Sequence, residues 1–132
     1  MTTTPTFESH IATFRADLAE HQKMLASSLR SLVSHGWVVV IRCPSIVEGG
    51  PDTFDVTDFT VEDRKVTNPR LSSVLRCRRF TKQDAIAIAS GVHNGAGHHG
   101  EAMTVVEALR HQIARLEDHI ATFENYIATL EA

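Results

Sequence analysis

The 132-residue chain has only two cysteines, and it has no long hydrophobic run. Cys43 and Cys77 are too few for the disulfide framework of a small secreted domain. No apolar stretch approaches the ~18 residues that a transmembrane helix requires. The start, Met1–Pro5, has neither the basic nor the apolar part of a signal peptide. We therefore expect a cytoplasmic protein without a membrane segment.

An excess of positive charge is also missing. The net charge is −3, which argues against a protein that binds nucleic acid or membranes with its whole surface. The hydrophobic content of 42% and charged content of 22% are ordinary for a globular protein. We predict a single domain over residues 1–132 with one packed body.

Residues 6–35 are the first of two long segments with the spacing of an amphipathic helix. Thr4 and Pro5 suit a helix start, and Gly36 suits a helix end. We predict one helix here, about 45 Å long at 1.5 Å per residue. Its apolar face consists of Phe7, Ile11, Phe14, Leu18, Leu25 and Leu32, with His21, Ser28 and His35 at the weaker positions.

Residues 101–131 are the second long segment, in which apolar residues follow an unbroken alternation of three- and four-residue steps. The capping box Thr104–Glu107 leaves open whether the helix starts at residue 101 or three residues later. One set of seam positions is β-branched and the other is mostly Leu, as in a parallel two-stranded coiled coil. The seam consists of Val106, Leu109, Ile113, Leu116, Ile120, Phe123, Ile127 and Leu130.

Both helices are much longer than the ~20 Å of an ordinary strand, so a small sheet cannot cover them. Burying a large apolar side chain contributes about 1.5–3 kcal/mol, so an uncovered seam would lose on the order of 10 kcal/mol. The seam therefore needs a partner helix. The partner is either a second chain, which makes the seam a homo-oligomer interface, or the first helix of the same chain packed antiparallel. We favour the homo-oligomer.

Residues 37–80 predict a small antiparallel sheet of three to four strands. The first strand is nearly continuous in apolar residues, which is typical of a central, buried strand. A change of phase near Thr57-Asp58 indicates a bulge, and Asn68-Pro69 indicates a turn. The expected strands are Trp37–Cys43, Thr53–Val61 and Leu71–Phe80.

Residues 81–91 form a short helix that starts with the capping box Thr81–Asp84, and a Gly/His loop follows over residues 92–100. The fold class is therefore α+β. It comprises a long N-terminal helix, a small antiparallel sheet, a short helix and a long C-terminal helix resembling a coiled coil.

The middle of the chain is divided by charge. Residues 46–63 hold six acidic and no basic residues, whereas residues 64–82 hold seven basic and no acidic residues. If Arg76 and Arg78 share a strand face near Arg42, they form an anion site, because guanidinium groups bind phosphate or carboxylate bidentately. Alternatively, the acidic and basic strands pair and neutralise each other. Few aromatic residues interleave with the basic ones, which disfavours nucleic acid.

The Gly/His loop allows three interpretations. Its glycines and the following helix start could cradle an anion, with His and Asn side chains as donors. Alternatively, His93, His98, His99 and Glu101 could ligate a divalent metal. In the third interpretation the loop is a simple reversal with surface histidines. It matches neither a Walker motif nor a dinucleotide fingerprint.

Catalytic motifs are missing. The sequence has no Gly-x-Ser-x-Gly elbow and no cysteine beside a histidine. Both cysteines fall on inward strand faces, as is typical of inert core thiols. We therefore expect no enzymatic activity and no cofactor.

Several short segments together carry a resemblance. The run Phe80–Ala87, the pattern Asn94-Gly95-x-Gly97, then Glu101 and Ala108-Leu109 resemble short uncharacterised accessory proteins of phages and prophages. The resemblance covers about a third of the chain. It implies a viral accessory context, in which small proteins bind host proteins or host signalling molecules.

These patterns predict a non-enzymatic, homo-oligomeric binding protein that sequesters or senses a phosphate-bearing, nucleotide-like small molecule. Two alternatives remain: an inhibitor or adaptor that binds a host macromolecule through the acidic segment 48–63 or a helix face, and a metal-dependent enzyme. The predicted ligand site comprises Arg76, Arg78, Phe80, His93, Asn94, Gly95, Gly97, His98 and His99.

Overall fold

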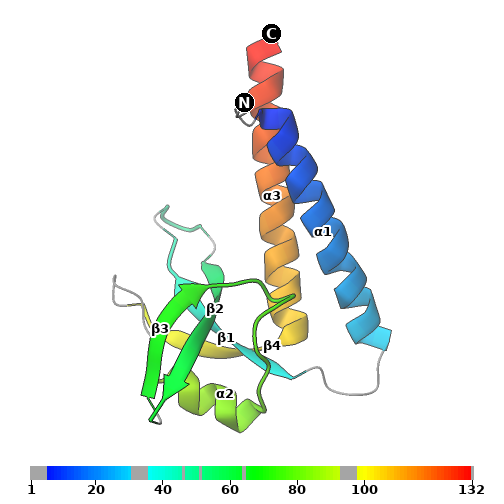
Figure 1. Ribbon diagram of the computed structural model, residues 1–132. Helices are drawn as coiled ribbons and strands as arrows, with labels where there is room; N and C mark the ends of the chain where they lie inside the picture. The colour runs from blue at the N-terminus through cyan, green and yellow to red at the C-terminus, as the bar shows by residue number, and fades with distance from the viewer. Residues whose placement is uncertain are drawn as a thin grey trace, which may run out of the picture.

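The computed structural model describes residues 6–30, 36–45, 47–50, 52–63, 65–92 and 98–131 (Figure 1). The fold is α+β, as predicted: a long helix, a small antiparallel sheet, a short helix and a second long helix follow one another. In chain order the elements are α1 (Phe7–Arg30), β1 (Trp37–Cys43), β2 (Thr53–Glu62), β3 (Lys65–Leu71), α2 (Lys82–Ala89), β4 (Gly100–Thr104) and α3 (Val105–Glu131).

The sheet has the strand order β3-β2-β1-β4, and all neighbouring strands are antiparallel. The central position predicted for the first strand is confirmed. Val38 and Val40 belong to one core cluster, and Val39 and Ile41 belong to the other. Because successive side chains of a strand point to opposite faces, β1 separates two cores. Its nearly continuous apolar run follows from this double burial.

One core joins the sheet to the two long helices. Leu109 of α3 is completely buried there, and Met24 and Leu25 of α1 pack against the same cluster. The other core joins the opposite face of the sheet to α2, with Phe59 and Ala89 buried in it. The start of α2 follows its predicted cap, since Thr81 Oγ1 accepts a hydrogen bond from the Asp84 backbone N–H.

The third strand differs from the prediction. The prediction of a strand over Leu71–Phe80 is wrong, because β3 spans Lys65–Leu71 and residues 72–79 form an irregular turn. The backbone N–H of Cys77 donates to the Ser73 carbonyl at 2.8 Å, which closes the turn. Val74 and Cys77 are both buried, and their three-residue spacing suits a turn of chain rather than a strand. The alternation of apolar residues in this segment is typical of a strand, and the wrong prediction followed from it.

The predicted irregularity in the second strand is present. The register between β2 and β3 shifts between Asp58 and Thr60, so that Asn68 and Pro69 together oppose one residue of β2. Asn68 has a φ of 52°, a left-handed conformation that Asn tolerates better than most residues. The segment predicted as a turn is therefore a bulge in an edge strand, where the missing N–H of proline is tolerated.

The fourth strand includes residues that we expected in the last helix. β4 covers Gly100–Thr104, and α3 begins at Val105. Met103 pairs with Val38 of β1 and is buried. Thr104 caps α3, with its Oγ1 accepting from the Glu107 N–H at 3.1 Å. The second possible helix start, three residues after position 101, was the better one.

The two long helices pack against each other in one chain. They are antiparallel and form a helical hairpin that extends away from the sheet, with the start of α1 and the end of α3 at its far end (Figure 1). The rings of Phe7 and Phe123 are 5.6 Å apart, and Arg15 forms an ion pair with Glu124. The antiparallel partner that we kept as the alternative is thus present. The predicted end of the first helix, over residues 31–35, lies outside the described residues.

Neither long helix, as far as the structure describes the chain, is apolar enough along its length to cross a membrane.

Candidate functional site

The residues of the predicted ligand site lie in three separate places. Arg76 faces α1. Arg78 and Phe80 pack beside Phe59 on the α2 side of the sheet. His98 and His99 precede β4. The other predicted ligand residues, His93, Asn94, Gly95 and Gly97, lie outside the described residues.

Arg78 is held by the sheet. Its Nη2 donates to the Phe59 carbonyl, and its Nε lies 3.6 Å from Asp58 Oδ1. The guanidinium carbon lies 5.2 Å from the Phe59 ring centroid and 5.9 Å from that of Phe80. The Phe59 and Phe80 rings are stacked, with their centroids 5.7 Å apart. Arg78 thus serves the packing of this face.

The described part of the Gly/His loop lies at the other end of the central strand. Gly100 pairs with Ile41, whereas Phe80 bridges to Trp37. These two points are four residue steps apart along β1, which is about 13 Å at 3.3 Å per residue. His98 is half-buried and His99 is exposed. The structure therefore does not bring these histidines together with Phe80.

Arg76 contributes to a groove that we call the α1 groove. It lies between the second half of α1 and the turn over residues 72–79, and its volume is about 520 Å³. That volume falls within the usual range for small-molecule sites. The groove is lined by Glu20, Lys23, Met24, Ser27, Ser28, Leu75, Arg76 and Arg79.

The α1 groove has an excess of positive charge. Lys23, Arg76 and Arg79 face one carboxylate, that of Glu20. Arg79 is oriented by its own contacts, because Nη2 donates to the Val74 carbonyl at 2.9 Å and lies 3.6 Å from Met24 Sδ. The Arg76 and Lys23 side chains form no hydrogen bond or ion pair within the described ranges. Two cations of the groove are therefore available to an anion.

Ser28 supplies the least expected feature of the α1 groove. Its residue is 6% exposed, and its Oγ has no hydrogen-bond partner in the part of the chain that the structure describes. A serine inside a helix commonly donates to the carbonyl four residues earlier, and a buried hydroxyl without a partner costs about 1–3 kcal/mol. A buried hydroxyl without a partner is rare and needs an explanation, such as a bound water or ion that completes its hydrogen bond.

A second hollow adjoins the α1 groove and shares Arg79 with it. Its volume is about 670 Å³, and it is lined by Gly36, Trp37, Arg79, Phe80, Thr81, Lys82 and Asp84. The Nζ of Lys82 lies 5.4 Å from the Trp37 ring centroid. Trp37 and Phe80 are both half-buried. The hollow thus adds aromatic surface beside Arg79, whereas Lys82 and Asp84 add one charge of each sign.

Several of the acidic and basic residues in the middle of the chain form ion pairs in the structure. Arg42 contacts Asp52 at 3.1 Å and Glu101 at 2.8 Å, and these hydrogen bonds, Glu101 first, raise the pKa of the Arg42 guanidinium. Arg115 of α3 pairs with Asp55 at 2.7 Å. On the neighbouring strands, Arg70 lies 3.6 Å from Asp58. This matches the self-neutralised alternative rather than a basic patch that includes Arg42.

Neither thiol is set up for catalysis. Burial raises the pKa of the Cys77 thiol, and burial followed by a hydrogen bond with Asp55 raises the pKa of Cys43. A raised pKa reduces the reactive thiolate fraction. Among the described residues, no cluster of three His, Cys, Asp or Glu side chains is placed to hold a metal ion. The proposed metal set includes His93, which lies beyond them.

Sequence reasoning missed most of the α1 groove. Lys23 and Ser28 belong to a helix that we interpreted only as a packing element, and Arg79 was counted only in the basic segment. One signal was present: a serine at position 28 of the apolar face, where a larger apolar residue would be expected.

Comparisons with protein-family models, with curated proteins and with solved structures found no match to this chain.

Proposed function

We propose that the protein is a non-enzymatic binding protein that holds a phosphate-bearing, nucleotide-like small molecule in the α1 groove. The observation that carries this proposal is the combination of three cations with a buried, unpartnered hydroxyl, that of Ser28, around one groove. A phosphate group provides several strong acceptor oxygens. It suits both the arginine donors and the serine O–H.

Each part of the groove has a distinct role in this proposal. Arg79, already oriented by the Val74 carbonyl, presents its remaining donors with little loss of entropy. Arg76 and Lys23 contribute positive charge to the phosphate, and rotation of the Ser28 side chain toward the groove lets its O–H donate to a phosphate oxygen. Met24 and Leu75 provide apolar contacts for the rest of the ligand. The base of the nucleotide-like ligand extends past Arg79 toward the hollow lined by Trp37 and Phe80, because a flat base stacks well on aromatic side chains.

Self-association through the long helices stays a prediction. The seams of one chain already face each other, so a second copy would have to cover residual apolar surface. Ligand binding as proposed does not depend on it, because all lining residues of the α1 groove come from one chain. A mass-resolved measurement of solution size tests it. The phage context and cytoplasmic location likewise stay predictions.

The ligand proposal is tested by thermal denaturation with a panel of nucleotides that includes cyclic and ADP-ribose species. A ligand at about 100 times its Kd stabilises the folded state by ~2.7 kcal/mol, which is a shift of several degrees. Arg76→Ala should reduce the shift strongly. Arg70→Ala removes an exposed arginine outside the groove and should leave it intact. No shift with any member of the panel would contradict the proposal.

Ser28→Ala provides a second, independent result. Removing the unpartnered hydroxyl should leave the free protein as stable as before or stabilise it by about 1 kcal/mol, because a buried polar group without a partner is lost. The same substitution should reduce the ligand-induced shift. A destabilised free protein would show instead that the hydroxyl has a partner in solution.

A further inference from the structure

The end of the helical hairpin remote from the sheet has features that the α1 groove does not explain. We define the distal hairpin as residues 6–18 of α1 with 116–131 of α3. It contains a connected cluster of rings with centroid separations between 5.3 and 6.5 Å. The members of the cluster are Phe7, His10, Phe14, His119, Phe123 and Tyr126.

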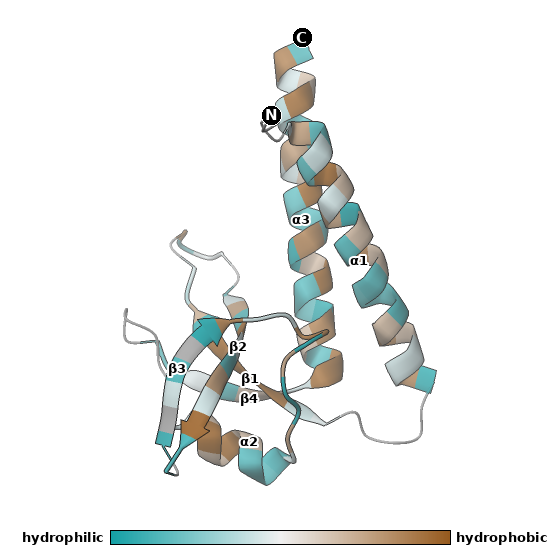
Figure 2. Ribbon diagram, viewed as in Figure 1, coloured by the Kyte–Doolittle hydropathy of each residue, from teal (hydrophilic) through white to brown (hydrophobic). Residues whose placement is uncertain are grey.

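This cluster is only partly covered. Within the distal hairpin as the structure describes it, Ile11 is the one buried side chain. Phe7, Phe14 and Phe123 are half-buried, Tyr126 is 52% exposed and Leu130 is 73% exposed. Hydrophobic residues continue to the end of α3, well beyond the sheet (Figure 2). Two helices alone give each seam residue one neighbouring helix, so much apolar area remains in contact with water.

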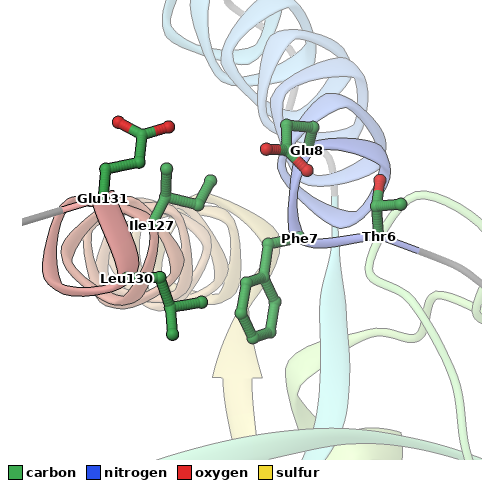
Figure 3. A pocket seen from close by; sticks show the side chains of 6 residues that line it. All are labelled: Thr6, Phe7, Glu8, Ile127, Leu130 and Glu131. Carbon is green, nitrogen blue, oxygen red and sulfur yellow. The ribbon is translucent and has the colours of Figure 1, made fainter.

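A pocket opens between the two helix ends at the tip of the distal hairpin. Its volume is about 420 Å³, and Thr6, Phe7, Glu8, Ile127, Leu130 and Glu131 line it. Phe7 and Glu8 of α1, with Thr6 just before it, face Ile127, Leu130 and Glu131 of α3. Figure 3 shows that Phe7 and Leu130 extend to the same side of the gap. Apolar walls with a carboxylate on either helix suit a long side chain with a positively charged end.

The distal hairpin is strongly acidic. It contains six carboxylates and one cation, Arg15, so its net charge is −5, whereas the whole chain has −3. Arg15 already forms an ion pair with Glu124. The carboxylates are those of Glu8, Asp17, Glu117, Asp118, Glu124 and Glu131.

We propose that the distal hairpin binds a basic amphipathic helix of another protein. An extended apolar strip between two helices is the surface that receives the apolar face of a third helix. Negative charge around the strip selects a helix whose other positions carry Lys or Arg, and it increases the rate of association. A second copy of this chain would bring two surfaces of −5 together, so the charge disfavours it as the occupant.

In the bound state, apolar residues of the basic helix at i, i+3, i+4 and i+7 pack on Phe14, Phe123 and Tyr126. A Lys or Arg near the end of that helix enters the tip pocket, with its stem against Leu130 and its charge between Glu8 and Glu131. A few residues supply most of the affinity of a protein interface, and Tyr is enriched among them, so Tyr126 is expected to contribute strongly.

The test uses the full chain and two labelled synthetic helices with Leu at positions i, i+3, i+4 and i+7. The other positions are Lys in one peptide and Glu in the second. Fluorescence anisotropy should show that the Leu/Lys peptide binds and that added salt weakens this binding. The Leu/Glu peptide should not bind. Glu8→Gln with Glu131→Gln should raise the Kd by about tenfold, if each ion pair contributes its usual share.

A matched control separates a site from general attraction to an acidic protein. Glu62→Gln with Asp63→Asn removes the same charge from the end of β2 and the residue that follows it, both exposed, and should leave the Kd unchanged. Equal effects of the two double variants, or absence of Leu/Lys binding, would overturn the proposal. A dimer in solution that Leu130→Ser dissolves would also overturn it, because a second copy would then cover the surface. The α1 groove lies at the other end of α1, so either proposal can fail while the other holds.

Discussion

The two ends of α3 carry the same sequence pattern and lie in opposite environments. Leu109 and Leu130 belong to one apolar seam, yet Leu109 is completely buried and Leu130 is 73% exposed. Leu109 lies where α3 meets both the sheet and α1. Leu130 lies where, among the described residues, α3 has only the start of α1 beside it. The seam shows which face of the helix is apolar, and the surrounding elements decide how much of it is covered.

The difference in burial between the two ends of α3 suggests different roles for the two ends of the molecule. At the sheet end, the fully buried side chains include Val38, Val74 and Leu109, and they come from three segments of the chain. Close packing from several directions provides most of the stability of a domain. The distal hairpin has one layer of contacts and leaves its aromatic cluster accessible. We infer that stability resides at the sheet end and that the distal hairpin is free to serve recognition.

The largest expected effect compares the two leucines directly. Leu109→Ala should reduce the free energy of unfolding by about 2–5 kcal/mol, because it leaves a cavity in a core that cannot collapse. Leu130→Ala should change it by less than about 0.5 kcal/mol. Urea denaturation followed by circular dichroism measures both. Similar losses for the two variants would mean that the far end of α3 is covered in solution, and the contrast drawn here would fail.

A smaller effect concerns Phe123, the ring that contacts most of the aromatic cluster. Phe123→Ala should destabilise the protein by less than Leu109→Ala, because the ring is only half-buried. Its effect should be local: amide hydrogen exchange should accelerate in the distal hairpin and stay unchanged in β1 and β2. Faster exchange throughout the sheet would show that the two ends unfold as one unit.

The smallest effect follows from burial of a thiol at the sheet end. Burial raises the pKa of Cys77 in the folded state above the ~8.5 of an unfolded chain. Above that pH the unfolded state releases a proton that the folded state keeps, so this contribution to stability is present at lower pH and decreases as pH rises. The destabilisation caused by Cys77→Ala should therefore be smaller at pH 10 than at pH 7.5. Leu109→Ala, which removes no titrating group, should show no such change between these pH values.

Elements with strong local signals were predictable. Both long helices follow from a regular apolar spacing, and the central strand follows from a run of β-branched residues. The starts of α2 and α3 follow from Thr81 and Thr104, whose hydroxyls accept the hydrogen bonds expected of caps. In each case the cause lies within a few residues of the signal, so no other part of the chain is needed to interpret it.

Other features depended on distant partners. Met103 belongs to a strand because β1 offers it an open edge, and nothing within Gly100–Thr104 signals that edge. Apolar and polar residues alternate over residues 72–79 as they do in a strand. The segment nevertheless forms a turn, because Val74 and Cys77 both enter the core shared with the long helices. The α1 groove likewise joins Lys23 and Ser28 to Arg79, more than fifty positions later in the chain.

Local patterning was thus sufficient for the class, the order of the elements and the apolar face of each long helix, because helix and strand periods are properties of neighbouring residues. Three features could be recognised only in the folded structure. They are the partner of the C-terminal seam, the contacts of Arg78 with the sheet, and the cluster of cations near Ser28. These depend on which elements meet, and the free energy of that meeting comes from burial across the whole domain.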